Sequence, residues 1–231
     1  MGYTVAVEQT VTTIQIPRTK FTSKEDIHIM NVMEQIKKLK IVPVVVIKEL
    51  SDAEPTLNAL REGGLPVAEI TFRTACAADA IKLACEKFPD MLIGAGTVIN
   101  GEQANRAIDC GAKFIVGPGF SAEVAEVCNK RGIAYLPGCV TPTEIITAIS
   151  YGIETVKFFP CTNYGGLGTI KALSAAFPAV KFVPTGGISA ENVLEYLAFD
   201  KIVACGGSWM MKGTYAEIAE KTKAAVTLVN G

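Results

Sequence analysis

The chain has 231 residues, 49% of them hydrophobic, which is enough to bury the core of one large domain or of two small ones. Its 22 basic and 23 acidic residues give a net charge of -1, and this balance argues against nucleic acid as a partner. The longest purely apolar run, IVPVVVI at 41–47, is far shorter than the roughly 20 residues that a membrane-spanning helix needs.

The cysteines indicate the compartment in which the protein works. The chain has seven cysteines, which are scattered from Cys76 to Cys205, and no two form a CxxC pair. This pattern is typical of reduced thiols in a cytoplasm rather than of a disulfide framework. The N-terminus also lacks the charged and then apolar pattern of a signal peptide. We therefore expect a cytoplasmic protein with no membrane partner.

The first 28 residues form an extension that differs from the rest of the chain. The stretch YTVAVEQTVTTIQIP alternates apolar and polar residues, which predicts one or two strands. It contains no candidate catalytic residue, and its origin is either natural or engineered. Its alternating pattern leaves open pairing with a sheet edge or with another chain. We divide the chain into this extension, 1–28, and a barrel domain, 29–231, in which a helix at 30–40 closes the N-terminal end of the barrel.

From residue 41 onward, short apolar runs alternate with longer amphipathic segments. Eight such runs predict strands, and they begin at residues 41, 67, 91, 113, 133, 154, 180 and 201. Several segments between them open on Ser or Thr and close on Gly, as helices do. This alternation predicts a parallel α/β fold with right-handed crossovers. Eight units favour a (β/α)8 TIM barrel, with a doubly wound open sheet as the alternative.

Lys157 is the first candidate for chemistry because it interrupts an apolar strand, ETVKFF at 154–159. Lysine is rarely buried without a partner or a purpose. Burial disfavours the charged ammonium, and the neutral amine that it favours is a nucleophile. The alternatives are a lysine that points outward between helices and one that only pairs with a carboxylate.

Glu69 repeats the anomaly in the strand VAEIT, residues 67–71. Two opposite charges on barrel strands can form a simple buried ion pair. They can also be an amine and its acid/base partner, because Schiff-base chemistry moves a proton at each step. The sequence leaves both interpretations open.

Other polar residues follow the predicted strands, where a barrel builds its active site. Arg73, Thr97, Thr185 and Ser208 come after strands two, three, seven and eight. Paired glycines in PTGGIS and CGGSW close the last two strands, and glycine lets backbone N–H groups approach an anion. Each pair alone is a weak signal, but both together predict a phosphate site.

The sequence gives no support for a bound cofactor. The one histidine, His28, lies in the extension, so the barrel lacks a histidine cluster for a metal. No GxGxxG or GxxxxGK[ST] motif occurs between a strand and a helix, which argues against nicotinamide cofactors and ATP. We expect an enzyme without a metal or organic cofactor.

Six motifs, AEITFRT, IGAGTV, PGCVTPTEI, VKFFP, VPTGGIS and CGGSW, occur here in the order and spacing of one family. From about residue 30 to 229 the chain resembles the 2-keto-3-deoxy-6-phosphogluconate (KDPG) and 4-hydroxy-2-oxoglutarate (KHG) aldolases. The resemblance implies a homotrimeric, metal-free class I aldolase of carbohydrate metabolism that releases pyruvate from a 2-oxo acid phosphate.

The resemblance also implies a role for each candidate residue. Lys157 would form the Schiff base, and Glu69 would transfer protons. Arg73 and Thr97 would hold the pyruvate carboxylate. The remaining substrate-binding residues would be Phe159 beside the imine, Thr185 at the substrate hydroxyls, and Gly186, Gly187, Gly207 and Ser208 at the phosphate.

The chain departs from the family pattern at a few positions. Val46 stands where some relatives carry an arginine, Gly117 replaces a serine, and Cys161 and Thr162 replace the Ala-Glu that commonly follows FP. None of these positions is Lys157 or Glu69, so the departures bear on affinity and substrate preference. Two other functions remain as alternatives: a trimeric scaffold with little activity, and a phosphate-binding barrel isomerase, which the central lysine disfavours.

Overall fold

Parallel strands form the wall of a barrel in the computed structural model, which describes residues 24–231 of the chain. Each of the apolar runs predicted from the sequence contains one of its strands. In this part of the chain they are β1 (Ile41–Val45), β2 (Val67–Thr71), β3 (Leu92–Gly96), β4 (Phe114–Val116), β5 (Ala134–Leu136), β6 (Thr155–Phe158), β7 (Lys181–Pro184) and β8 (Cys205–Gly207).

The strands close into a ring. Six of them form a parallel sheet in the order β5-β4-β3-β2-β1-β8, and β6 pairs with β7. Isolated parallel bridges join the two groups. One connects Gly138 to Lys157 after β5, and two connect β7 and the residue after it to the β8 segment, from Phe182 to Ile202 and from Thr185 to Gly206. The predicted (β/α)8 barrel is therefore confirmed, and the open-sheet alternative is wrong.

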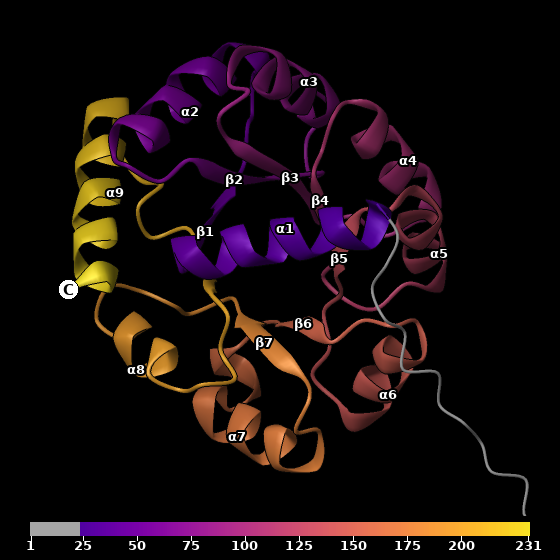
Figure 1. Ribbon diagram of the computed structural model, residues 1–231. Helices are drawn as coiled ribbons and strands as arrows, with labels where there is room; N and C mark the ends of the chain where they lie inside the picture. Colours follow the sequence, from indigo (N-terminus) through magenta and orange to yellow (C-terminus); the bar gives the residue numbers. More distant parts are fainter. Residues whose placement is uncertain (1–23) are drawn as a thin grey trace, which may run out of the picture.

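Helices surround the barrel (Figure 1). The chain places them in the order α1 (Lys24–Leu39), α2 (Ala53–Glu62), α3 (Ala77–Lys87), α4 (Gly101–Asp109), α5 (Ala122–Arg131), α6 (Pro142–Ser150), α7 (Gly166–Ala176), α8 (Val193–Leu197) and α9 (Tyr215–Asn230), with short 3-10 turns η1 (Leu50–Asp52) and η2 (Thr162–Tyr164). The predicted caps occur at α6 and α9, where Thr141 and Thr214 form capping boxes with Glu144 and Glu217. None of the helices among the described residues is long and apolar enough to cross a membrane.

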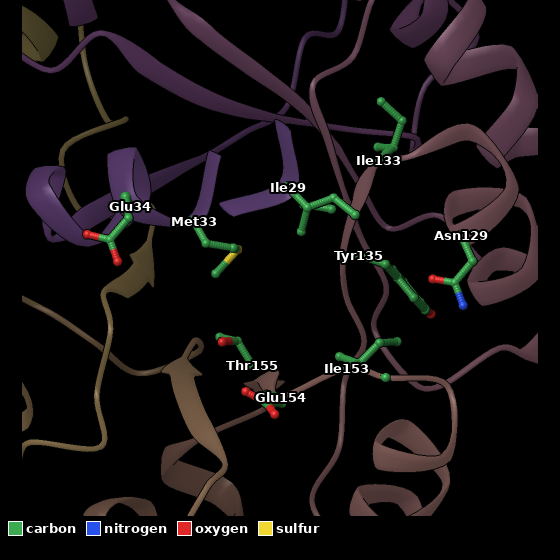
Figure 2. A pocket seen from close by; sticks show the side chains of 11 residues that line it. Ile29, Met33, Glu34, Asn129, Ile133, Tyr135, Ile153, Glu154 and Thr155 are labelled. Atoms are coloured by element: carbon green, nitrogen blue, oxygen red, sulfur yellow. The ribbon is translucent and has the colours of Figure 1, made fainter. Parts of the chain in front are cut away.

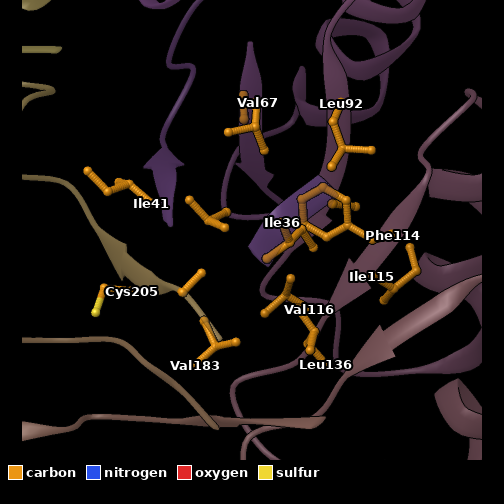
Figure 3. Packing of buried hydrophobic residues seen from close by; sticks show 14 of the residues in the cluster. Ile36, Ile41, Val67, Leu92, Phe114, Ile115, Val116, Leu136, Val183 and Cys205 are labelled. Carbon is orange, nitrogen blue, oxygen red and sulfur yellow. The ribbon is translucent and has the colours of Figure 1, made fainter. Parts of the chain in front are cut away.

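Helix α1 lies across one end of the barrel (Figure 1). It begins at Lys24, earlier than the predicted start at residue 30, and so includes His28 of the predicted extension. Its Ile36 is completely buried, close to Phe114 and Val116 of β4 (Figure 3). The predicted strands of the extension lie outside the described residues, and the boundary at residue 28 stays a prediction.

Candidate active site

The predicted polar residues meet at the C-terminal ends of the strands. A cavity of about 210 Å³ opens there. Its lining residues are Val44, Arg73, Lys157, Phe159, Thr185, Gly186, Gly187, Ile188, Gly207 and Ser208. The two other predicted residues, Glu69 and Thr97, lie directly behind this lining, where each contacts a residue of the cavity wall.

Lys157 and Glu69 form a buried pair in the middle of the site. Nζ of Lys157 donates to Oε1 of Glu69 over 3.3 Å. The two residues are only 5% and 3% exposed, so each charge has lost most of its hydration. Such a pair is a weak source of stability, because the loss of hydration offsets much of the attraction between the charges. Since the amine also lines the cavity, it is available to a bound molecule.

Gly96 at the end of β3 creates the space for Glu69. A Cβ atom on Gly96 would lie 2.2 Å from Oε1 of Glu69, closer than two such atoms can approach. The register places Glu69 beside Gly94 and Thr71 beside Gly96 on neighbouring strands. The absence of a side chain at Gly96 therefore fixes where the carboxylate lies.

Arg73 and Thr97 form a second contact at the edge of the cavity. Nε of Arg73 donates to Oγ1 of Thr97 over 3.1 Å. Thr97 has φ of 57°, a left-handed backbone that a β-branched residue rarely adopts. Strain of this kind persists only where the surrounding structure holds it, and it clusters at functional sites. The exposed guanidinium keeps its other N–H donors for a carboxylate.

Apolar side chains border the amine. Nζ of Lys157 lies 5.2 Å from the centre of the Phe159 ring. Val44 and Ile188 also line the cavity, and the sequence analysis missed both. The register of β1 against β2 places Val44 beside Glu69, so correct strand pairing was the signal that could have identified it.

The first glycine pair, Gly186 and Gly187, follows β7 in a turn whose carbonyls accept hydrogen bonds from the segment after β6. The amide of Cys161 donates to the carbonyl of Thr185 over 2.8 Å, and that of Thr162 to the carbonyl of Gly186 over 3.2 Å. In a trans peptide the N–H points away from the carbonyl. The N–H groups of Gly186 and Gly187 therefore point away from these partners. That of Gly186 is directed toward β8, where Thr185 and Gly206 form a bridge, and no acceptor for that of Gly187 occurs among the described residues.

The second glycine pair is also followed by a free backbone N–H at the cavity wall. Gly207 ends β8, and Ser208 follows it at the cavity wall. The backbone N–H of Ser208 also lacks an acceptor among residues 24–231. Successive free N–H groups in a turn form an anion-binding concavity. The two glycine pairs thus offer one anion site at the side of the cavity formed by β7 and β8.

Two residues that depart from the family pattern, Cys161 and Val46, are absent from the cavity lining. Cys161 is buried, its thiol donates to the Tyr196 hydroxyl over 3.5 Å, and burial raises the pKa of this thiol. It is therefore protonated at neutral pH and a poor nucleophile. Val46 is 44% exposed and lies outside the cavity lining.

A second cavity, also of about 210 Å³, lies at the opposite end of the barrel (Figure 2). Ile29 and Met33 of α1 line it together with Ile133, Ile153 and other residues at the beginnings of β5 and β6. The N-terminal face of a barrel contributes to stability, whereas catalysis takes place at the C-terminal face. The cavity that contains Lys157 is therefore the candidate active site.

The described residues include no group of three His, Cys, Asp or Glu side chains that could hold a metal ion. His28 is exposed on α1, at the end of the barrel away from Lys157. The chemistry that the cavity itself offers is that of an amine beside a carboxylate, with cationic and backbone donors around it.

Comparison with known proteins identifies the family. The profile described as "Aldolase: KDPG and KHG aldolase" matches residues 32–227. The chain belongs to the KDPG and KHG aldolase family. This match covers the whole barrel and every candidate residue of the site.

Individual members of the aldolase family agree with this assignment. The 2-dehydro-3-deoxy-phosphogluconate aldolase of Treponema pallidum (strain Nichols) is 43% identical over 182 residues, which cover 79% of this chain and 87% of the relative. The KHG/KDPG aldolase of Escherichia coli (strain K12) is 37% identical over 192 residues, which cover 80% of this chain and 90% of the relative.

Solved structures of other proteins share the fold. The KDPG aldolase of Legionella pneumophila, crystallised with pyruvate captured as a covalent carbinolamine intermediate, has a TM-score of 0.81 and 38% identity, covering 84% of this chain and 97% of that chain. A cube-shaped protein cage designed by fusing symmetric oligomeric domains has a TM-score of 0.77 and 27% identity, covering 84% of this chain and 73% of that chain.

Proposed function

We propose that this chain is a class I aldolase that cleaves 2-dehydro-3-deoxy-6-phosphogluconate to pyruvate and glyceraldehyde 3-phosphate. It also cleaves 4-hydroxy-2-oxoglutarate, to pyruvate and glyoxylate. The observation that carries the proposal is the contact of 3.3 Å between the buried Lys157 amine and the Glu69 carboxylate at the wall of a cavity. The names of the relatives support the substrates.

The pair supplies both groups that Schiff-base formation needs. Transfer of a proton from the Lys157 ammonium to Glu69 gives a neutral amine next to a carboxylic acid. The amine attacks the C2 carbonyl, and the carbinolamine that results loses its hydroxyl as water when the acid returns the proton. The product is an iminium at C2, and Glu69 is again a carboxylate.

Carbon-carbon cleavage uses the same two residues. Glu69 removes the proton of the C4 hydroxyl, the C3–C4 bond breaks, and its electron pair moves to the iminium nitrogen. The aldehyde leaves, and an enamine stays on Lys157. Protonation at C3 by Glu69 and addition of water at C2 then release pyruvate and restore the free amine.

The surrounding donors hold the two ends of the substrate. Arg73 and Thr97 bind the carboxylate next to C2, because a guanidinium recognises a carboxylate with two N–H donors. Phe159 packs beside the imine, 5.2 Å from the amine nitrogen. Thr185 contacts the substrate hydroxyls, because its side chain brings a hydroxyl group to the wall of the cavity.

The glycine turns bind the phosphate. The free N–H groups of Gly187 and Ser208 are backbone donors, and Gly186 and Gly207 have no side chain that would keep the phosphate away. The unphosphorylated substrate lacks a group that reaches these donors. This difference provides a way to test the phosphate site separately from the chemistry.

The protein assembles as a homotrimer in the cytoplasm. In support, Ile146 and Ile149 are 58% and 45% exposed on one face of α6, as apolar residues at subunit contacts are in an isolated chain. A trimeric scaffold with little activity is the second candidate, favoured by the similarity to a cage built from oligomeric domains. The mass of the purified protein in solution tests the trimer.

Pyruvate release from each substrate tests the function. The purified chain is mixed with either 2-oxo acid, and pyruvate is measured continuously. Turnover of both substrates is expected. If a folded sample released no pyruvate from the first substrate and none from the second, the scaffold would be the better account.

A further inference from the structure

Asn192 occupies the N-cap of α8, yet its side chain does not cap that helix. Instead its carboxamide contacts the turn after β7 in two places. Nδ2 donates to the carbonyl of Gly187 over 2.9 Å, and Oδ1 accepts from the backbone N–H of Ser189 over 2.9 Å. An asparagine at such a position normally satisfies the first N–H groups of its helix. Here both of its polar groups hold the turn.

The Asn192 contact completes a series of three. The carbonyls of Thr185 and Gly186 are bound by the backbone amides of Cys161 and Thr162, and the carbonyl of Gly187 is bound by Asn192. Each contact lies on the side of its peptide opposite the N–H. Asn192 is the one side chain in this series.

The peptide that Asn192 holds carries the N–H of Ile188. Ile188 lines the cavity, and its N–H lacks an acceptor among the described residues. With the carbonyl of Gly187 tied to Asn192, this N–H is directed away from α8. It becomes the second free donor of the turn, next to that of Gly187.

Packing holds the same turn from the other side. Gly187 has φ of 78°, and a Cβ atom on it would lie 2.1 Å from Oγ1 of Thr162. The backbone of Gly187 therefore lies directly against Thr162 with no room for a side chain, and the hydrogen bond holds its carbonyl at Asn192. The turn is confined between two residues that are absent from the cavity lining.

We propose that Asn192 is a positioning residue for substrate phosphate, which it serves by directing the N–H of Ile188 into the anion site of the glycine turn. The proposal rests on the proposed function, because it needs the phosphate to bind there. Asn192 itself does not touch the substrate. Its removal frees the Gly187–Ile188 peptide to rotate, and the phosphate then loses a fixed donor.

The test compares two variants of Asn192 on two substrates. Asn192→Ala removes both contacts, and Asn192→Asp keeps an acceptor for Ser189 but places a negative charge against the Gly187 carbonyl. Asn129→Ala is the matched control, because Nδ2 of Asn129 also holds a backbone carbonyl, that of Tyr151, far from the glycine turn. For each protein, kcat and KM are measured with the phosphorylated substrate and with 4-hydroxy-2-oxoglutarate.

Asn192→Ala should raise KM for the phosphorylated substrate about 3- to 10-fold, the effect of one lost hydrogen bond, with kcat unchanged. Asn192→Asp should raise it further. The kinetic constants for 4-hydroxy-2-oxoglutarate should stay at their wild-type values in both variants, and Asn129→Ala should match wild type on both substrates.

Two outcomes would overturn the role of Asn192. One is an equal loss on both substrates, which would indicate a general structural role. The other is an unchanged KM for the phosphorylated substrate in both variants.

Measurement of Ser208→Asp in parallel distinguishes a failure of the Asn192 role from a failure of the phosphate site. If Ser208→Asp weakens only the phosphorylated substrate while the Asn192 variants do not, the phosphate site stands and the positioning role fails. If Ser208→Asp also shows no such selectivity, the phosphate site itself fails.

Discussion

Lys157 and Glu69 lie 88 positions apart in the sequence, yet their side chains meet at 3.3 Å inside the barrel. They come from β6 and β2, which stand on opposite sides of the ring of strands. The contact therefore crosses the interior and depends on the closed barrel. Every prediction about the chemistry follows from the position of this pair at the wall of a cavity.

Borohydride should trap pyruvate on Lys157, because the reagent reduces an imine to a stable secondary amine. Peptide mass spectrometry would locate the adduct. Lys157→Arg keeps a positive charge beside Glu69 but cannot form the imine, so this variant should give no adduct and no turnover. An adduct on a different lysine would show that the nucleophile has been misassigned.

Glu69→Gln should retain pyruvate binding but lose turnover by about 10² to 10⁴, the usual contribution of a general acid/base. The amide keeps the shape of the carboxylate and cannot accept the proton. Measurement of kcat together with pyruvate affinity checks this prediction. Wild-type turnover in the variant would reduce Glu69 to a partner in an ion pair.

Gly96→Ala should lower kcat for both substrates, because the new Cβ atom needs the space that Oε1 of Glu69 occupies. Gly168→Ala is the matched control, since a Cβ atom there would meet nothing within 4 Å. The control should have wild-type kinetics and equal or higher stability, as alanine favours helix α7 over glycine. Normal kcat in Gly96→Ala would mean that the exact position of the carboxylate does not matter.

Ser208→Asp should raise KM for the phosphorylated substrate and leave kcat/KM for 4-hydroxy-2-oxoglutarate nearly unchanged. A carboxylate at this position repels a phosphate dianion, whereas the shorter substrate has no group near it. The effect falls on KM because the phosphate is remote from the bond that breaks. Parallel losses on the two substrates would instead point to a damaged barrel.

The free energy of unfolding should fall as the pH rises above about 9. Burial raises the pKa of Cys128 and of Cys139 to about 12, from 9.0. Between these values the unfolded thiols lose protons that the folded protein retains, so alkaline pH favours unfolding. Urea unfolding measured from about pH 8 to pH 10 would show the trend. Cys128→Ala should show a shallower dependence, and an equally steep one would exclude this thiol as a cause.

Much of the fold was predictable because each unit repeats the same local pattern. The run VAEIT is a complete strand in the structure, and Thr141 before an amphipathic segment does cap a helix. The start of α1 at Lys24 was less predictable, because KEDIH lacks the apolar periodicity on which the prediction relied. Helix ends are in general the least certain part of such a prediction.

The site was predictable where a charged residue interrupts an apolar strand or where a motif matches the family. Lys157 and Glu69 satisfied both conditions. Val44 and Ile188 satisfied neither, because an apolar side chain in an apolar segment does not reveal which side of the barrel it faces. Asn192 was missed because it acts through the backbone of Gly187 and Ser189, and a hydrogen bond to backbone leaves no signature in a single sequence.

The two places where isolated bridges close the barrel have a consequence for a chain that is still folding. Lys157 is itself one end of the bridge after β5, and Thr185 is one end of the bridge after β7. A chain that has built the sheet of β1 to β5 but has not yet joined β6 and β7 to it has no paired amine and no anion site. Catalytic competence thus requires the closed barrel, and a chain whose barrel is still open does not present the paired lysine and the anion site together to the sugar acids and aldehydes around it.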